Sequence, residues 1–287
     1  MDFQAFINDI VTNRWNVHGV EAIQQGQLCY SWGDKTGLHP IYSATKSVLS
    51  VAVGIAVDEG RLDLSAPLTE YLPKAALADM TAAQRKAFAP VTLHRLMTMS
   101  VKGFPFRAEG NDWLAYSLAC PLEHPEIPTF DYSNIPAYLT GVALTHAISQ
   151  DAGQWIRERI FAPLGIADCR MGRCPSGYFY GASQMELSVE SLCKIGLMLM
   201  QGGVYQGQRI VSEKYVNTAT SVQQMNREGG YGYFFWKYRD GFSINGKWKQ
   251  KCYVLPKQGL VIGYLSHIED PSHALVESME KHLLGIE

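Results

Sequence analysis

A serine and a lysine three residues apart, Ser43 and Lys46, could together perform acyl transfer. Residues at this spacing lie on the same side of a helix, close enough for a hydrogen bond between hydroxyl and amine. The lysine acts as a base only when it is neutral, and burial lowers a lysine pKa from its usual value of about 10.4. The longest apolar run of the chain, Val48 to Val57, follows directly. The sequence therefore predicts a central helix that begins at Ser43, whose dipole disfavours a cationic lysine and favours a developing oxyanion.

The same four-residue pattern occurs twice more, at 191–194 and 278–281. Lys194 belongs to an amphipathic segment, where we expect it to extend to solvent, and Lys281 belongs to a polar-faced terminal helix. Ser43 itself has an alternative interpretation as a helix N-cap, with Lys46 a solvated lysine of the first turn. The apolar character of the helix that follows favours the catalytic interpretation.

A proton relay between serine, lysine and leaving group needs a third polar residue, and Tyr132 is a candidate. A phenol near a cationic lysine can have a lowered pKa and act as a base or relay. Asn134, two residues later, could hold Lys46 and a substrate carbonyl. Tyr215 and Asn217 repeat this spacing, and the alternative for Tyr132 and Asn134 is a turn tyrosine and a helix-capping asparagine.

The composition is that of a globular enzyme-sized chain. It has 287 residues, 47% of them hydrophobic, and a net charge of −2, which argues against a disordered chain and against nucleic acid or an acidic membrane as a general partner. The apolar run is shorter than the ~20 residues of a membrane span, and the N-terminal segment lacks the pattern of a secretory signal. Six scattered cysteines are typical of reduced thiols. We expect a cytoplasmic protein without cofactor; eight histidines without paired spacing indicate no metal site, and His94 and His146 are expected to be hydrogen-bonded helix residues.

The elements predict an α+β fold in which strands near both ends of the chain pair in one antiparallel sheet. Phe3, Phe6, Ile7, Ile10 and Val11 share one face of a first helix. The other expected elements are a hairpin around Gln25-Gly26, helices at 81–88, 91–99, 135–151 and 191–203, strands at 231–238, 241–246, 247–255 and 260–268, and a closing helix from near Asp270. We expect a sheet-and-helix subdomain from residues 1–60 and 191–287, a mostly helical subdomain at 61–190, and an active-site cleft between them.

The chain resembles the serine β-lactamase-related, penicillin-binding-protein-like superfamily, in the branch of class C β-lactamases, family VIII esterases and DD-peptidases. The segments that carry the resemblance are 43–47, 59–67, 70–73, 96–100, 130–134, 160–165, 200–203, 231–233 and 252–256. The resemblance implies an antiparallel sheet flanked by helices, an inserted all-α subdomain and a covalent acyl-serine intermediate. It also implies that Ser43 is the nucleophile and Lys46 its base, that Tyr132 passes the proton to the leaving group, and that Asn134 positions Lys46 and the acyl group.

The chain departs from this superfamily at the third motif, where a Lys-Thr-Gly, a His-x-Gly or a similar string of small residues normally lines the cleft. The equivalent stretch here is 245–250, with Asn245, Gly246, Lys247 and Trp248 as candidate substrate-binding residues. Gly246 would allow a close approach, and backbone N–H groups of this strand would join that of Ser43 in an oxyanion hole. By the same resemblance Tyr231 lines the cleft.

Three lysines, Lys247, Lys249 and Lys251, alternate along this predicted strand and would share one face. They could attract a carboxylate-bearing substrate, or they could protect an exposed strand edge from aggregation.

These residues predict a serine hydrolase that acts by acyl transfer on a small ester, amide or β-lactam-like substrate, with water as the final acceptor of the acyl group. Because no export signal is visible, we expect an intracellular esterase or amidase. The alternative is a catalytically weak penicillin-recognising sensor or binding protein of the same fold. The sequence does not indicate the oligomeric state.

Overall fold

Strands from both ends of the chain form one six-stranded antiparallel sheet, in the order β2-β1-β11-β10-β9-β8. The computed structural model describes residues 1–286. The strands are β1 (Val17–Gln24), β2 (Gln27–Gly33), β8 (Trp236–Tyr238), β9 (Gly241–Gly246), β10 (Gln250–Leu255) and β11 (Leu260–Ser266). The predicted hairpin pairs Gln24 with Gln27, and β1 pairs with β11 along its length. The α+β fold and the pairing of N-terminal with C-terminal strands are confirmed.

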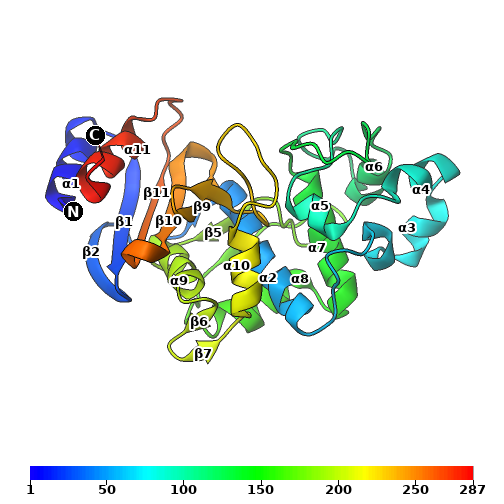
Figure 1. The fold of residues 1–287 in the computed structure, drawn as a ribbon, viewed down its shortest axis with the longest axis horizontal. Coiled ribbons are helices and arrows are strands. Elements are labelled where there is room, and N and C mark those ends of the chain that lie inside the picture. The colour runs from blue at the N-terminus through cyan, green and yellow to red at the C-terminus, as the bar shows by residue number, and fades with distance from the viewer. Residues whose placement is uncertain (287) are drawn as a thin grey trace.

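One face of the sheet is covered by the first and last helices, α1 (Phe3–Thr12) and α11 (Ala274–Met279), which bring both chain ends to the same side (Figure 1). Phe6, Ile7 and Ile10 are buried as predicted, but Val11 is 61% exposed. The closing helix begins at Ala274 and not near Asp270. The Asp270 carboxylate accepts a hydrogen bond from the Ser272 N–H at 2.7 Å, so these residues form a turn before the helix.

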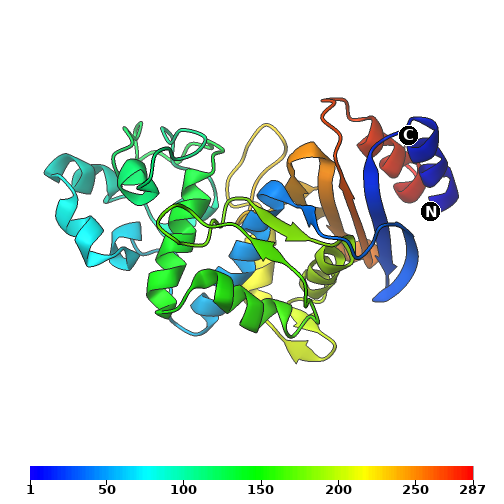
Figure 2. The ribbon, with the colours of Figure 1, turned by 180° about the vertical axis from the view of Figure 1, so that it is seen from behind.

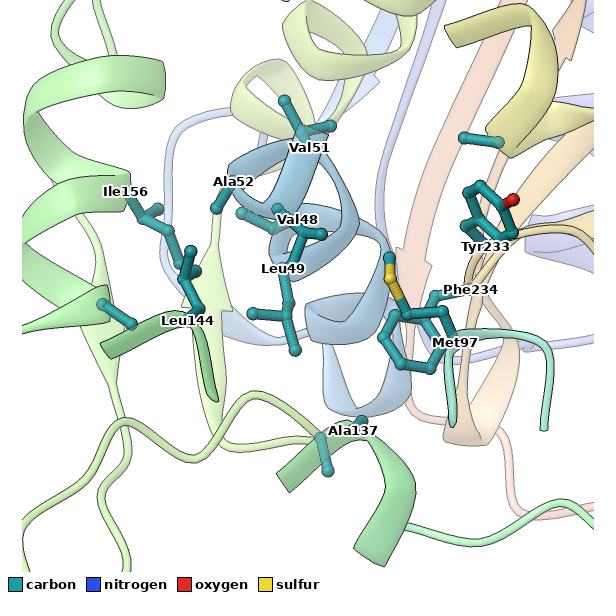
Figure 3. Packing of buried hydrophobic residues seen from close by; sticks show 14 of the residues in the cluster. Val48, Leu49, Val51, Ala52, Met97, Ala137, Leu144, Ile156, Tyr233 and Phe234 are labelled. Carbon is teal, nitrogen blue, oxygen red and sulfur yellow. The ribbon is translucent and has the colours of Figure 1, made fainter. Parts of the chain in front are cut away.

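The central helix α2 (Thr45–Asp58) is buried on nearly all sides, since 12 of its 14 residues are buried. Figure 3 shows its apolar side chains lying between Leu144 and Ile156 on one side and Met97 and Phe234 on the other. The lack of a side chain at Gly54 lets the Tyr215 ring pack directly against α2, since a Cβ there would lie 2.4 Å from that ring. A polar side chain pointing inward from α2 is therefore held in apolar surroundings.

Eight α-helices lie between residues 61 and 220, and those at residues 74–148 lie on the side of α2 away from α1 and α11 (Figure 2). The eight are α3 (Lys74–Asp79), α4 (Ala82–Phe88), α5 (Leu93–Met97), α6 (Trp113–Leu118), α7 (Ile135–Ile148), α8 (Ala152–Ile156), α9 (Val189–Met200) and α10 (Glu213–Thr220). Short strands also occur. β3 (His39–Pro40), which precedes α2, forms a three-stranded sheet with β4 (Arg170–Met171) and β5 (Met185–Leu187), and β6 (Val204–Tyr205) pairs with β7 (Gln208–Arg209). The sequence did not indicate these pairs. The division at residues 61 and 190 stays a prediction.

Two predicted strands are shorter than expected. The segment 231–238 becomes a strand only at Trp236, because Phe234 has a φ of 64° and interrupts the extended backbone. Residues Lys247–Lys249 form a 3-10 turn between β9 and β10, with Trp248 at φ 59°. The Gln250 side chain donates to the Lys247 carbonyl at 3.0 Å and so fixes this turn. The prediction that Lys247, Lys249 and Lys251 alternate on one strand face is therefore wrong.

Of the helices within residues 1–286, none has both the length and the apolar character that a membrane crossing requires. The cytoplasmic location stays a prediction.

Candidate active site

Ser43 lies in a 3-10 turn, Tyr42–Ala44, that leads directly into α2. Tyr42 has a φ of 48°, in the left-handed region that non-glycine residues rarely adopt and that often marks functional sites. The N-cap of α2 is Ala44, which makes no side-chain capping bond. The alternative interpretation of Ser43 as the N-cap is therefore wrong, and its hydroxyl is available for other contacts.

The Lys46 side chain extends from the first turn of α2 into the interior, where the residue is only 1% exposed. Its Nζ is 3.1 Å from Ser43 Oγ, 2.7 Å from Asn134 Oδ1 and 2.8 Å from the Ala182 carbonyl oxygen. Within residues 1–286 no carboxylate lies at ion-pair distance from this amine. Burial lowers the pKa of Lys46 to about 7, because it removes the hydration of the charged amine.

The partners of Lys46 determine which hydrogen bonds its amine donates and which one it can accept. A neutral amine has two N–H donors and one lone pair. The amide oxygen of Asn134 and the carbonyl oxygen of Ala182 can only accept, so they take the two N–H groups. The lone pair is left for the Ser43 hydroxyl, which can donate. This is the arrangement that a general base and its nucleophile require.

Tyr132 lies next to both groups. Tyr132 lines the same cavity as Ser43, and Lys46 Nζ is 5.1 Å from the centroid of its ring. Burial raises the pKa of Tyr132 to about 12, the opposite of the lowering that the sequence predicts. The prediction assumed a cationic lysine, whereas the buried Lys46 loses its charge near pH 7. Tyr132 is therefore a neutral phenol that can donate and relay a proton.

The segment that carries Tyr132 and Asn134 is held by backbone contacts with the loop after α5. The Asp131 N–H donates to the Met99 carbonyl at 2.7 Å, and the Asp131 carboxylate accepts from the Gly103 N–H at 3.1 Å. The Asn134 N–H donates to the Phe106 carbonyl at 2.7 Å, directly before α7 begins. These contacts fix the phenol and the amide across from α2.

A cavity of about 340 Å³ opens onto Ser43, within the usual size range of small-molecule sites. We call it the Ser43 cavity. It is lined by Tyr42, Ser43, Phe106, Tyr132, Asn134, Ser183, Glu228, Trp236, Asn245, Gly246 and Lys247. Of the predicted site residues, Lys46 lies beneath this lining, and Tyr231 and Trp248 lie elsewhere. Tyr231 is 1% exposed and packs edge-on against the Tyr132 ring, so it supports the phenol from behind. Trp248 packs against Tyr42 and His267.

Gly246 is the close-approach residue of this cavity. A Cβ there would lie 2.2 Å from the Ile41 carbonyl oxygen, so any larger residue would push β9 away from the chain before Ser43. The backbone of Gly246 and Lys247 thereby lines the same cavity as Ser43, although the segment is a strand end and turn and not the continuous strand predicted.

The repeated sequence patterns lie in different surroundings. Lys194 forms an ion pair with Glu190 at 2.8 Å and extends toward solvent, and Ser278 donates to Asp9 at 2.7 Å. Tyr215 donates to the Ser50 carbonyl at 2.9 Å and packs against α2. His94 and His146 hydrogen-bond with tyrosine hydroxyls at 3.0 and 2.9 Å. No group of three His, Cys, Asp or Glu side chains suited to a metal occurs within the described residues 1–286.

Several site residues were missed by the sequence analysis. The Ala182 carbonyl is the third partner of Lys46. Phe106, Glu228 and Trp236 come from loops and a strand start without a motif. Only Gly181-Ala182-Ser183, a run of small residues near a turn, gave a signal that could have been noticed.

Comparisons with known proteins identify the family of this chain. A family model described as Beta-lactamase matches residues 8–284. The 6-aminohexanoate-dimer hydrolase of Paenarthrobacter ureafaciens is 24% identical over 271 residues, covering 81% of this chain and 67% of that protein. An octameric penicillin-binding protein homologue from Pyrococcus abyssi has a TM-score of 0.74 at 20% identity, over 99% of this chain and 78% of that one. The D-amino acid amidase of Ochrobactrum anthropi has a TM-score of 0.71 at 15% identity, over 98% and 96%. The chain belongs to the beta-lactamase family of serine hydrolases.

Proposed function

We propose that this protein hydrolyses a small ester or amide through an acyl-enzyme on Ser43, with Lys46 as the base. The observation that carries the proposal is the buried amine 3.1 Å from Ser43 Oγ, whose two other partners can only accept hydrogen bonds. With a pKa of about 7, Lys46 has an unprotonated fraction at neutral pH that can take the hydroxyl proton.

In the first half-reaction Ser43 Oγ attacks the carbonyl carbon as its proton passes to Lys46. The negative charge that develops on the carbonyl oxygen is held by backbone N–H groups of Ser43 and of the Gly246–Trp248 segment. Loss of one such donor typically costs about 10²–10³ in rate. Tyr132 passes the proton to the leaving group, and Asn134 keeps Lys46 and the acyl group in position.

In the second half-reaction a water molecule attacks the acyl carbon and gives its proton to the same relay. The ester bond to Ser43 breaks, the acid leaves and the serine hydroxyl is restored. The names of two similar proteins, a dimer hydrolase and an amidase, favour an amide within this substrate class. A cytoplasmic location is part of this proposal.

The test compares Ser43→Ala with Ser191→Ala, which removes the serine of a repeated pattern. Turnover of p-nitrophenyl esters should vanish in Ser43→Ala and persist in Ser191→Ala, with the circular dichroism spectrum unchanged in both. Full turnover by Ser43→Ala would reject the proposal. A penicillin or fluorophosphonate label that stays on Ser43, without ester turnover, would favour the penicillin-recognising sensor.

A further inference from the structure

Two opposite charges line the Ser43 cavity. Glu228 belongs to the segment between α10 and β8, and Lys247 belongs to the turn after β9. Both side chains are exposed, and within residues 1–286 neither forms an ion pair. They enter the cavity from two different segments, and Ser43 enters it from a third. A ligand that reaches Ser43 therefore meets one free carboxylate and one free ammonium group.

Hydrogen bonds within its loop fix the backbone of Glu228. Asn226 Oδ1 accepts hydrogen bonds from the backbone N–H groups of Glu228 and Gly230, each at 2.9 Å. The carboxylate also acts on the catalytic groups: burial is the main cause of the raised pKa of Tyr132, and the negative charge of Glu228 adds to it. Glu228 is thus close enough to the reacting centre for its charge to matter there.

The opposite wall offers polar groups of its own. Lys247 Nζ lies 4.4 Å from the centroid of the Trp248 ring, a cation–π contact that leaves the ammonium free to bind an anion. Asn245 lines the same cavity, and its buried Oδ1 accepts no hydrogen bond from the described residues. A buried polar atom without a partner is costly, so it favours a ligand that brings an N–H group.

We propose that the Ser43 cavity takes a short linear amide with an ammonium group at one end and a carboxylate at the other. Glu228 binds the ammonium and Lys247 the carboxylate, while Ser43 attacks the amide carbonyl between them. This proposal rests on the proposed function and names its substrate class. It also assigns a purpose to the lysine that replaces the small residues of the third motif.

The reaction balances with water as the only co-substrate. Ser43 Oγ forms an ester bond to the acyl carbon as the C–N bond breaks, and the amine leaves with the proton that Lys46 took from Ser43. Water then breaks the ester bond, releases a carboxylate and returns the hydroxyl. Each product is an amino acid, with one ammonium and one carboxylate group.

The experiment uses linear ω-amino acid dimers of increasing length, from glycylglycine to the 6-aminohexanoate dimer. Each length is prepared free, N-acetylated and as the C-terminal methylamide. At the best length, kcat/KM of the free dimer should exceed that of each capped form by about 5- to 20-fold, the range between exposed and well-formed charge-assisted contacts.

Four variants assign each preference to its residue. Glu228→Gln should abolish the preference for the free amine and keep that for the free carboxylate, and Lys247→Gln should do the reverse. Glu269→Gln and Lys249→Gln are matched controls, because these side chains lie near the turn but outside the Ser43 cavity. Both controls should keep both preferences.

Equal kcat/KM for free and capped dimers at every length would overturn the proposal. If wild-type protein also fails to hydrolyse p-nitrophenyl acetate, the proposed function itself fails. Titration calorimetry of the same dimers with the unmodified protein then decides the substrate class alone. Tighter binding of the free dimer that is lost in Glu228→Gln would support the charge assignment, and equal binding of all forms would reject it.

Discussion

Ser43–Lys46 and Ser191–Lys194 have the same four-residue pattern and opposite surroundings. Lys46 is 1% exposed and contacts Ser43, whereas Lys194 extends along α9 to an ion pair with Glu190. Within residues 1–286 no hydrogen bond joins Ser191 to Lys194, and Ser191 instead accepts one from Ser188. The pattern supplies the two groups in both copies, and we propose Lys46 as the base because its amine is buried without a carboxylate partner among residues 1–286.

The two tyrosine patterns differ in the same way. Tyr132 lines the cavity that opens onto Ser43, and Asn134 Oδ1 accepts a hydrogen bond from Lys46. Tyr215 instead bonds to the backbone of α2, and its ring fills the space that Gly54 leaves. In both comparisons the copy that we propose as reactive either belongs to the first turn of α2 or contacts it.

Removal of the two lysines should give the largest difference. In Lys46→Ala, kcat/KM for p-nitrophenyl esters should fall by about 10³-fold, because a positioned general base contributes about 10²–10⁴. Lys194→Ala should change it by less than about 2-fold, since an exposed ion pair is worth little. Stopped-flow ester hydrolysis measures both. Comparable losses in the two variants would show that the burial of Lys46 has no catalytic meaning.

Substitution of the two tyrosines should give a smaller difference. Tyr132→Phe should lower kcat/KM by about 10²-fold through loss of the relay. Tyr215→Phe should keep the rate and lower the free energy of unfolding by about 1 kcal/mol, because a buried hydroxyl loses its partner. Ester kinetics and urea unfolding together separate the two effects. A rate loss in Tyr215→Phe without one in Tyr132→Phe would show that Tyr132 is not the proton relay.

The pH dependence of stability should give the smallest effect. Lys46 has a pKa of about 7 when folded and about 10.4 when unfolded, so between these values the unfolded chain binds the extra proton. The free energy of unfolding of wild-type protein should therefore rise with pH, relative to Lys46→Met, by up to about 1.4 kcal/mol per pH unit. Urea unfolding from pH 7 to pH 9 measures it, with Lys194→Met as the control. Parallel wild-type and Lys46→Met curves would contradict the lowered pKa.

The sequence predicted the features that depend on local pattern. The hairpin at Gln25-Gly26 and the central helix could be predicted because turn residues and an apolar run are local signals. The order of the superfamily motifs predicted the α+β fold, which the structure confirms.

The remaining site features depend on contacts between distant segments. The Ala182 carbonyl is 136 residues from Lys46 and has no side-chain signal at all. The turn at Lys247–Lys249 is held by a hydrogen bond from the Gln250 side chain. The alternation of residues along the sequence does not indicate that bond. The predicted lowering of the Tyr132 pKa was wrong because burial of the phenol itself raises its pKa, and a local sequence pattern does not indicate that burial.

Activation of Ser43 by a neutral Lys46 is tested most directly by the rate at which the serine is covalently labelled. A fluorophosphonate probe is reacted with the protein from pH 5 to pH 10, and the modified peptide is identified by mass spectrometry. We expect labelling of Ser43, with a rate that rises with pH and levels off above a midpoint of about 7. Labelling at another serine, or a rate at Ser43 that keeps rising to pH 10, would contradict it.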